Sequence, residues 1–340
     1  MTVNPDWDAL AAALGPRARR DEPLARYTAM RVGGPADLLI VCERTDDVVG
    51  AVDRARRHNV PWQVLGGGCN VLVADRGVRG LVIVNRAARI TFDPAAGVAW
   101  AEAGALLAVL AREAVERGLA GLEWAAGLPG AVGGAVVGNA GAFEGDVASV
   151  LRSATVLGPD GVVVERSNEW FEFDYRLSRI KRAAEQRSRG AEGQGSRGAE
   201  GQGSRSAEGQ GSRSAEGQSD GGDVVLAATF GLRPGDPEPL AVRADEILEW
   251  RRTRHPSGAT MGSTFKNPPG SHAGYLIEQA GLRGTRVGGA QISELHGNFF
   301  MNTGSATAAD VLALIEHART EVRHQFGVEL ELEIELVGRW

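Results

Sequence analysis

The glycine-rich stretch at residues 124–143 has the composition of a backbone loop that binds a large ligand. It holds six glycines, one proline and no charged side chain. Glycine adopts positive φ values and has no Cβ to block a close approach, and the N–H groups of such a loop can bind phosphate or the edge of a flat ring. A tight corner between helix and strand, packed glycine on glycine, explains these residues equally well. The length would also allow a membrane span, but glycine and proline are poor helix formers.

A second glycine cluster, Gly66-Gly67-Gly68-Cys69-Asn70, follows an expected strand at residues 61–65. Glycines directly after a strand are typical of a loop that cradles phosphate. The pattern is neither GxGxxG nor GxxxxGK[ST], and an extended apolar run follows it where those motifs need a helix. This disfavours an ordinary dinucleotide fold or a P-loop. A loop between strands that holds a pyrophosphate and a plain hairpin turn both remain open.

Composition is that of a soluble globular enzyme with two or three domains. The 340 residues are 43% hydrophobic and 24% charged, and the net charge of −6 argues against a nucleic-acid surface. The first residues lack the basic and apolar pattern of a signal peptide. Cys42 and Cys69, the only cysteines, define neither a disulfide framework nor a metal cluster. We therefore expect a cytoplasmic monomer with no metal site and no membrane or nucleic-acid partner.

Hydrophobic periodicity predicts alternating helices and strands. We expect an amphipathic helix followed by a loop within residues 1–23, and a helix at 46–58, capped by Thr45, inside a βαβ unit. Further strands are expected at 38–42, 61–65, 81–84, 98–101, 150–157, 162–165, 224–230 and 298–302, and further helices at 105–117, 243–251 and 273–280.

The last forty residues combine a helix with an alternating strand. Thr307 is expected to cap a helix at 308–326 whose core face carries Val311, Ile315, Ala318 and Val322. Strict alternation over residues 328–337 predicts a strand with its four glutamates on one face.

Residues 188–219 repeat an eight-residue unit, and their only apolar side chains are alanines. Such a segment cannot offset its ordering entropy by burial, so we predict that it is disordered. A solenoid of such units would have no core.

Four ordered stretches, extended by two more in the last third, together resemble the UDP-N-acetylenolpyruvoylglucosamine reductase (UDP-N-acetylmuramate dehydrogenase) family. Each motif alone is weak, but the ordered set is specific and covers nearly the whole chain outside the repeat. The stretches are Tyr27-Thr28 with Arg31-Val32-Gly33-Gly34-Pro35-Ala36; Gly66-Gly67-Gly68-Cys69-Asn70; Gly127-Leu128-Pro129-Gly130 with Gly133-Gly134-Ala135-Val136 and Asn139-Ala140-Gly141; Tyr175-Arg176-Leu177-Ser178; Ser263-Thr264-Phe265-Lys266-Asn267-Pro268; and Ala273-Gly274-Tyr275-Leu276-Ile277-Glu278.

The resemblance implies a mixed α/β and α+β fold: two FAD-binding subdomains of the PCMH/VAO type and a C-terminal α+β domain that binds substrate. On this chain the subdomains would be residues 1–85 and 86–240, with the repeat inserted at 188–219. The substrate domain would be 241–327, and a C-terminal strand at 328–340 would return to the active site.

The reaction implied by the resemblance uses NADPH to reduce FAD. The flavin then passes hydride to UDP-N-acetylglucosamine enolpyruvate, giving UDP-N-acetylmuramate for peptidoglycan. Hydride addition leaves an enolate-like intermediate, which needs cationic or hydrogen-bonding stabilisation and then a proton.

The resemblance also implies three catalytic residues. Arg176 would stabilise the enolate, Ser263 would give the proton, and Glu333 would assist Arg176. Each has an alternative role: Arg176 in a salt bridge to Asp174 or Glu172, Ser263 as a cap or turn residue, and Glu333 as one of several solvated glutamates.

Cofactor and substrate contacts follow from the resemblance in the same way, with FAD bound and NADPH as co-substrate. The residues expected at FAD are Tyr27, Thr28, Arg31, Gly33, Gly66, Gly67, Gly68, Cys69, Asn70, Gly127, Pro129, Gly130, Gly133, Gly134 and Asn139. The residues expected at the substrate are Tyr175, Lys266, Asn267 and His296. Lys266 and Lys181 are the only two lysines of the chain, which favours a specific requirement for Lys266.

Two departures from the family pattern are visible. Cys69 stands where the family usually has serine, and a thiol would make a similar but weaker hydrogen bond, so we expect FAD binding to persist. The chain has no tyrosine between Tyr175 and Tyr275, which resembles the branch lacking a tyrosine-bearing loop over the site.

Two other functions are compatible with part of these features. Another FAD oxidoreductase of the same superfamily, acting on a sugar or hydroxy acid, would keep the glycine loops but not Arg176 together with the Ser263 motif. A nucleotide-binding regulator without turnover would keep the fold and show no hydride transfer.

Overall fold

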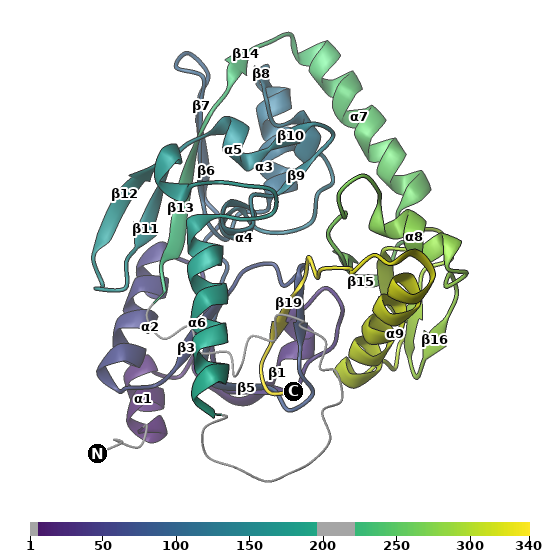
Figure 1. Ribbon diagram of the computed structural model, residues 1–340. Coiled ribbons are helices and arrows are strands. Elements are labelled where there is room, and N and C mark those ends of the chain that lie inside the picture. Colours follow the sequence, from purple (N-terminus) through teal and green to yellow (C-terminus); the bar gives the residue numbers. More distant parts are fainter. Residues whose placement is uncertain (1–5, 196–221) are drawn as a thin grey trace.

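The computed structural model describes residues 6–195 and 222–340, and its first sheet is built from the N-terminal part of the chain. The strand order is β1 (Arg19–Pro23), β2 (Pro35–Cys42), β5 (Val78–Asn85) and β3 (Trp62–Leu65). Strand β5 is parallel to both β2 and β3, whereas β1 is antiparallel to β2. Helices α1 (Trp7–Leu14) and α2 (Thr45–Arg57) pack against this sheet (Figure 1). The expected βαβ unit is confirmed, with β5 between its two strands.

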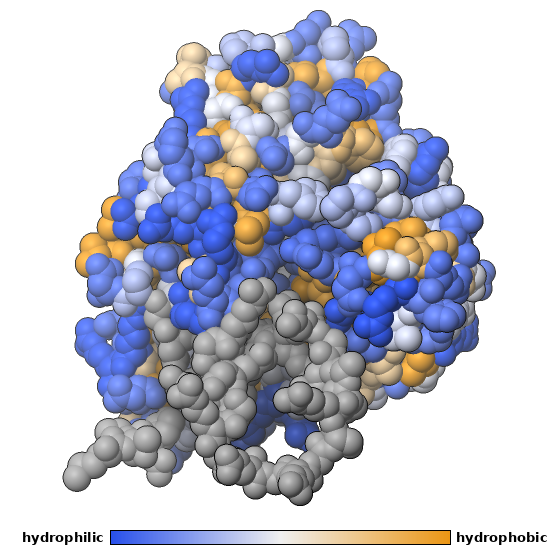
Figure 2. All heavy atoms as spheres, viewed as in Figure 1, coloured by the Kyte–Doolittle hydropathy of each residue, from blue (hydrophilic) through white to orange (hydrophobic). Residues whose placement is uncertain are grey.

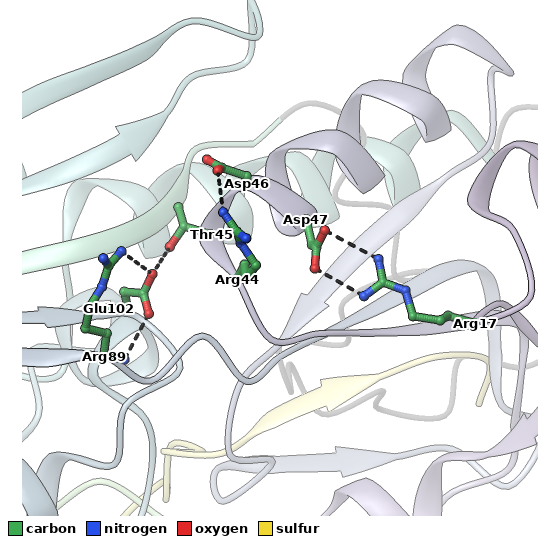
Figure 3. Close-up of polar contacts among 7 residues, drawn as sticks. All are labelled: Arg17, Arg44, Thr45, Asp46, Asp47, Arg89 and Glu102. Carbon is green, nitrogen blue, oxygen red and sulfur yellow. Dashed lines mark hydrogen bonds and ion pairs between the residues drawn. The ribbon is translucent and has the colours of Figure 1, made fainter.

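Two expectations for this region are wrong. Residues 19–23, expected as a loop, form strand β1, because their charged side chains are tolerated at the exposed edge of a sheet. Thr45 does not cap α2; the N-cap is Arg44, and the Thr45 hydroxyl donates a 2.9 Å hydrogen bond to Glu102 Oε1. Figure 3 shows Glu102 between Thr45 and Arg89. Arg89 donates two hydrogen bonds to the Glu102 carboxylate, one from its backbone N–H and one from its guanidinium. This contact joins α2 to the second sheet.

The second sheet is antiparallel and uses strands from both sides of residues 196–221. Its order is β12 (Val163–Ser167), β11 (Leu151–Leu157), β13 (Val224–Gly231), β7 (Val98–Glu102) and β6 (Ile90–Asp93). Strand β13 therefore returns to the centre of the sheet. Helices α3 (Leu107–Glu116) and α4 (Val132–Val137) share a buried core with β13.

Helix α6 (Arg179–Gly195) leads from the second sheet into the repeat. Its backbone is helical as far as Gly195, so the prediction of disorder is wrong for residues 188–195. A helix that is already nucleated adds further residues at little cost, and residues 179–187 supply the nucleus. The rest of the predicted disorder, residues 196–219, lies outside the described residues.

The third unit is a four-stranded sheet covered by two helices. Its order is β15 (Ala259–Ser263), β18 (Phe299–Asn302), β17 (Ala290–Ile292) and β16 (Arg286–Val287), with α8 (Ala273–Gln279) and α9 (Ala308–Phe326) packed in its core. Helix α9 has the expected bounds and the expected buried face, and Thr307 caps it in a capping box with Asp310. Helix α7 (Pro237–Arg254), which starts earlier than expected, runs from the second unit to the third (Figure 1).

The C-terminal segment at residues 328–337 is not the single continuous strand that we expected. Only β19 (Glu335–Val337) is a strand, and it pairs in parallel with β4 (Val71–Val73) of the first unit. The alternation itself is correct, because Leu330, Ile334 and Leu336 are buried.

The segment changes its hydrogen-bonding partner halfway along. The N–H of Lys266 donates to the Glu331 carbonyl at 2.8 Å, and the N–H of Glu333 donates to the Thr264 carbonyl at 2.9 Å. Two residues later, the N–H of Glu335 donates to the Asn70 carbonyl at 2.9 Å. The segment therefore connects the third unit to the first.

The remaining elements are short. They are η1 (Leu24–Tyr27), β8 (Leu119–Ala120), η2 (Glu123–Ala125), β9 (Gly141–Ala142), β10 (Gly145–Asp146), α5 (Val147–Val150), η3 (Asn168–Phe171) and β14 (Arg233–Pro234). Across residues 6–195 and 222–340, none of the helices combines the length and the apolar character needed to cross a bilayer. Figure 2 shows that hydrophilic side chains cover most of the described surface on the face of Figure 1.

Candidate active site

The C-terminal segment brings Glu333 into contact with Arg176. Arg176 Nε lies 2.8 Å from Glu333 Oε1, and Arg176 Nη2 donates a 2.8 Å hydrogen bond to the Gly141 carbonyl. The alternative salt bridges of Arg176 to Asp174 or Glu172 are not formed; the Glu172 carboxylate pairs with Arg179 and Arg182 instead. The guanidinium therefore has one carboxylate partner, and that partner comes from the other end of the chain.

A tight turn presents Arg176 to Glu333. Asp174 and Leu177 exchange backbone hydrogen bonds, and Arg176 between them has φ of 55°. Asn139 Nδ2 donates to the Asp174 carbonyl at 3.0 Å, and its Oδ1 accepts the N–H of Ala148 at 3.0 Å. The buried Asn139 side chain thus stabilises the turn that carries Arg176. The sequence analysis, which expected Asn139 at FAD, did not include this role.

Glu333 is the one glutamate of its segment that is largely buried. Its side chain is 17% exposed, against 51% for Glu329, 75% for Glu331 and 46% for Glu335. Burial raises the pKa of the Glu333 carboxyl, against the opposing positive charges of Arg176, Lys181 and Lys266. Of the four glutamates of this segment, only Glu333 contacts Arg176.

Ser263 lies beside the same segment. It ends strand β15, and the next residue, Thr264, accepts the N–H of Glu333. It is neither a helix cap nor a turn residue, and its hydroxyl makes no hydrogen bond with other described residues. The hydroxyl is therefore available to a bound molecule.

Of the residues expected at the substrate, Lys266 and Tyr175 lie beside charged side chains of the candidate site, whereas Asn267 and His296 make contacts within the third unit. Lys266 Nζ lies 3.4 Å from the exposed Glu331 carboxylate, and Tyr175 is exposed with its ring 5.4 Å from the Arg176 guanidinium. Asn267 Oδ1 accepts the Ala273 N–H at the start of α8, so its carbonyl oxygen holds the fold. His296 packs at 4.8 Å from the Phe299 ring, its Nδ1 accepts the Asn298 N–H, and burial lowers its pKa.

Three loops that carry the expected FAD residues converge. The Ala29 N–H donates to the Gly68 carbonyl at 2.9 Å, which joins loop 27–31 to loop 66–70. A Cβ on Gly68 would lie 2.1 Å from the Tyr27 carbonyl oxygen, and one on Gly67 would lie 3.2 Å from Gly130 Cα. The contact at Gly68, where φ is also 64°, requires glycine, and the contact at Gly67 would be tight for any other residue.

The remaining glycines separate into packing positions and open positions. A Cβ on Gly33, Gly127 or Gly133 would lie within 2.9 Å of a neighbouring side chain. A Cβ on Gly130 or Gly134 would have nothing within 4 Å among the described residues. These two glycines therefore leave space beside the loop that an added Cβ would fill. Gly130 also has φ of 123°, which favours glycine by itself, whereas Gly134 is not among the glycines with positive φ.

Several residues expected at FAD make local hydrogen bonds or adopt an unusual backbone conformation within these loops. The Thr28 hydroxyl donates to the Val32 carbonyl and accepts the Val32 N–H, and the Tyr27 hydroxyl donates to Glu22. Arg31 adopts a left-handed φ of 56°. Cys69 Sγ donates to the Gly67 carbonyl at 3.3 Å, and burial raises the pKa of its thiol.

Arg251 is a candidate site residue that the sequence analysis did not select. Its guanidinium lies 5.3 Å from the Phe143 ring, and a Cβ on Gly127 would lie 3.4 Å from its Cδ. Its Nε and Nη2 are buried without a hydrogen-bond partner among the described residues, and burial lowers its pKa to about 10. The only sequence signal was an arginine beside Trp250 on a helix that follows the glycine-rich stretch.

Two further observations concern metal ligands and a cavity near the glycine-rich stretch. Within residues 6–195 and 222–340, no group of three or more His, Cys, Asp or Glu side chains is placed to hold a metal ion. A cavity of about 510 Å³ between η2, β10 and α7 is lined by Trp124, Phe143 and Arg243, among others, but not by Arg176, Ser263 or Glu333.

Comparison with known proteins identifies the family. A profile of the UDP-N-acetylenolpyruvoylglucosamine reductase C-terminal domain matches residues 254–337, and a profile of an FAD binding domain matches residues 36–167. The chain is 42% identical to the UDP-N-acetylenolpyruvoylglucosamine reductase of Rubrobacter xylanophilus over 97% of this chain and 99% of the relative. It is 41% identical to that of Chloroflexus aggregans over 94% of this chain and 97% of the relative.

A solved structure agrees with the sequence relatives. The crystal structure of UDP-N-acetylenolpyruvylglucosamine reductase from Thermus caldophilus superposes with a TM-score of 0.71 at 33% identity, covering 94% of this chain and 99% of that one. The chain belongs to the UDP-N-acetylenolpyruvoylglucosamine reductase family.

Proposed function

We propose that this chain reduces UDP-N-acetylglucosamine enolpyruvate to UDP-N-acetylmuramate for peptidoglycan synthesis, with FAD as cofactor and NADPH as reductant. The observation that carries the proposal is the contact of the buried Glu333 with Arg176, beside a free Ser263 hydroxyl. Family membership supplies the substrate and the reductant. We further propose a cytoplasmic monomer.

The residues around the glycine loops fit FAD. We assign the cofactor to the region where residues 1–85 and 86–240 meet, beside Gly130 and Gly134, whose open sides allow close approach of a large flat or phosphorylated group. Residues 241–327 would form the substrate domain. When bound, the flavin supplies a hydride that it has accepted from NADPH.

Arg176 and Ser263 complete the reduction. Once the terminal carbon of the enolpyruvyl group holds the hydride, the electron pair of the former double bond lies on the neighbouring carbon and its carboxylate. The Arg176 guanidinium stabilises that negative charge, and Glu333 fixes the orientation of the guanidinium through the 2.8 Å contact. Ser263 Oγ gives its proton to the neighbouring carbon, which yields the saturated lactyl ether.

The charges of the site favour an anionic substrate. The cations Arg176, Lys181 and Lys266 are largely buried, whereas the carboxylates of Glu331 and Glu335 are exposed to solvent that screens them. Arg251 adds a buried guanidinium that has no anion partner among the described residues. We assign Arg176, Lys266 and Arg251 to the carboxylate and the diphosphate of the substrate.

Anaerobic half-reactions test the proposal. The purified protein should be yellow, lose its flavin absorbance with NADPH, and recover it rapidly on addition of UDP-N-acetylglucosamine enolpyruvate but not of UDP-N-acetylglucosamine. A yellow protein that is reduced but not reoxidised would instead indicate another oxidoreductase of the superfamily. A protein that takes up no FAD would exclude both.

A further inference from the structure

Lys181 is a buried lysine at the edge of the candidate active site for which the reaction described above has no role. It lies in the first turn of α6, three residues after Ser178. Ser178 is fully buried; its hydroxyl donates to the Val137 carbonyl at 2.6 Å and accepts the Lys181 N–H at 3.3 Å. The backbone of Lys181 is therefore fixed to α4 by the same motif that presents Arg176.

The side chain of Lys181 points toward the C-terminal segment. It is 8% exposed, and Nζ lies 4.0 Å from Glu335 Oε1. Its charge also acts on the Glu333 carboxyl, two residues earlier in the segment. Burying an ammonium group is unfavourable unless a negative charge compensates it, and the half-exposed Glu335 at 4.0 Å is a weak partner. Glu333, two residues earlier in the same segment, is the more buried carboxylate, and its partner Arg176 belongs to the turn that leads into α6.

The groups that face Glu333 come from three elements. Arg176 contacts it from the turn before α6, Lys181 acts from α6 itself, and Lys266 acts from the loop after β15. Glu331 and Glu335 are its neighbours on the same segment and pair with Lys266 and Lys181. The two lysines thus pair with the carboxylates two residues before and two residues after Glu333.

We propose that Lys181 is a positioning residue for the reductive step, whose buried ammonium keeps the Glu333 carboxylate charged and paired with Arg176. This inference rests on the proposed function. Removal of the ammonium leaves Glu333 buried with one cation fewer, so the carboxyl takes up a proton at a higher pH. A protonated Glu333 orients Arg176 less well, and transfer to the substrate slows.

The test is the pH dependence of flavin reoxidation by UDP-N-acetylglucosamine enolpyruvate after anaerobic reduction with NADPH. In Lys181→Met the acid limb of the profile should move to higher pH. Reoxidation should be roughly three- to tenfold slower on that limb and close to wild type at high pH. Reduction by NADPH should be unchanged. Lys181→Arg, which keeps the charge, should restore the wild-type profile.

A matched control lies one residue further along the helix. Arg182 pairs with the exposed Glu172 at 3.1 Å, so Arg182→Met also removes a cation of α6 but leaves Glu333 untouched. Its pH profile should match wild type. A profile of Lys181→Met that matches wild type, or that is lowered equally at every pH, would overturn the proposal. If Lys181→Met does not retain FAD, Lys181→Gln takes its place.

A second measurement separates Glu333 from Glu335 as the group through which Lys181 acts. When Lys181→Met is made in a Glu335→Gln background, the shift of the acid limb should persist, because Glu333 is still present. A shift that disappears in this background would mean that Lys181 acts only through Glu335 and would overturn the proposal. If wild type itself is not reoxidised, the proposed function fails, whereas the results above concern Lys181 alone.

Discussion

Asn70 Nδ2 donates a hydrogen bond of 3.1 Å to the backbone carbonyl of Glu333, although the two residues are 263 positions apart. Asn70 ends the glycine cluster assigned to FAD, and Glu333 contacts the arginine assigned to the enolate. One side chain therefore links the loop that we propose binds FAD to the segment that carries Glu333.

Asn70→Ala should loosen this link without unfolding the protein. A single hydrogen bond contributes roughly 0.5–1.5 kcal/mol, so flavin reoxidation by substrate should slow by about two- to tenfold. Asn168→Ala is the control, because its amide also donates to backbone carbonyls, those of Ala148 and Leu151. Stopped-flow measurement of both half-reactions checks this; an equal effect of the two variants on reoxidation would contradict it.

Glu333→Gln and Glu331→Gln should separate the buried carboxylate from its solvated neighbour. A neutral amide cannot form the charged pair with Arg176, and hydrogen bonds to charged groups contribute roughly 1.5–3 kcal/mol, so reoxidation of Glu333→Gln should slow by at least about tenfold. Glu331 is 75% exposed, and exposed pairs contribute little, so Glu331→Gln should change the rate by less than about threefold. Similar losses in both variants would count against the assignment of Glu333.

Gly133→Ala and Gly134→Ala should have opposite consequences although the two positions are adjacent in α4. A Cβ on Gly133 would lie 2.9 Å from Ala103 Cβ, so Gly133→Ala should destabilise the fold by about 1–3 kcal/mol. A Cβ on Gly134 meets no described residue within 4 Å, so Gly134→Ala should be as stable as wild type or more stable by about 0.5–1 kcal/mol.

Cofactor affinity provides the second readout for this pair. If FAD lies against the open side of Gly134, the added methyl group should weaken FAD binding at least about tenfold, or 1.4 kcal/mol. Denaturant unfolding of the apoprotein and FAD titration measure the two effects separately. Unchanged FAD affinity in Gly134→Ala would place the cofactor elsewhere.

Local and long-range determinants explain which features the sequence predicts. Helix α9 could be predicted to its end residues, because its cap, Thr307, and its buried face lie within twenty residues of each other. The same reasoning failed for Thr45, because its partner Glu102 comes from another sheet, 57 positions away. A cap prediction from sequence cannot include a competing partner that only the tertiary fold supplies.

In the candidate site, too, features set by neighbouring residues could be predicted, and features set by distant partners could not. The family resemblance carried by the ordered motifs is what proposes Arg176, Ser263 and the glycine loops as site residues. Alternation alone could not select Glu333 among four glutamates, since the choice depends on which one lies against Arg176. The place of Arg251 beside Trp250 on an expected helix was too weak a signal to select it, because its contact with Phe143 comes from more than a hundred positions earlier in the chain.

His255 should give the protein an acid-sensitive component of stability. Burial lowers its pKa from 6.5 to about 4, so between these values the unfolded chain binds a proton that the folded protein does not. The stabilisation is complete above pH 6.5 and is lost as the pH falls toward about 4. His255→Phe should therefore lose less stability than wild type over this range. Denaturant unfolding at several pH values measures the effect, and identical acid slopes would contradict it.

The measurement that tests the central claim most directly is a comparison of the two half-reactions in Ser263→Ala. The hydroxyl acts only after hydride has left the flavin, so reduction by NADPH should keep its wild-type rate. Reoxidation by UDP-N-acetylglucosamine enolpyruvate should slow by ~10²–10⁴-fold, the usual contribution of a positioned proton donor. Equal slowing of both half-reactions, or an unchanged reoxidation rate, would contradict the assignment of Ser263 and the reductase mechanism built on it.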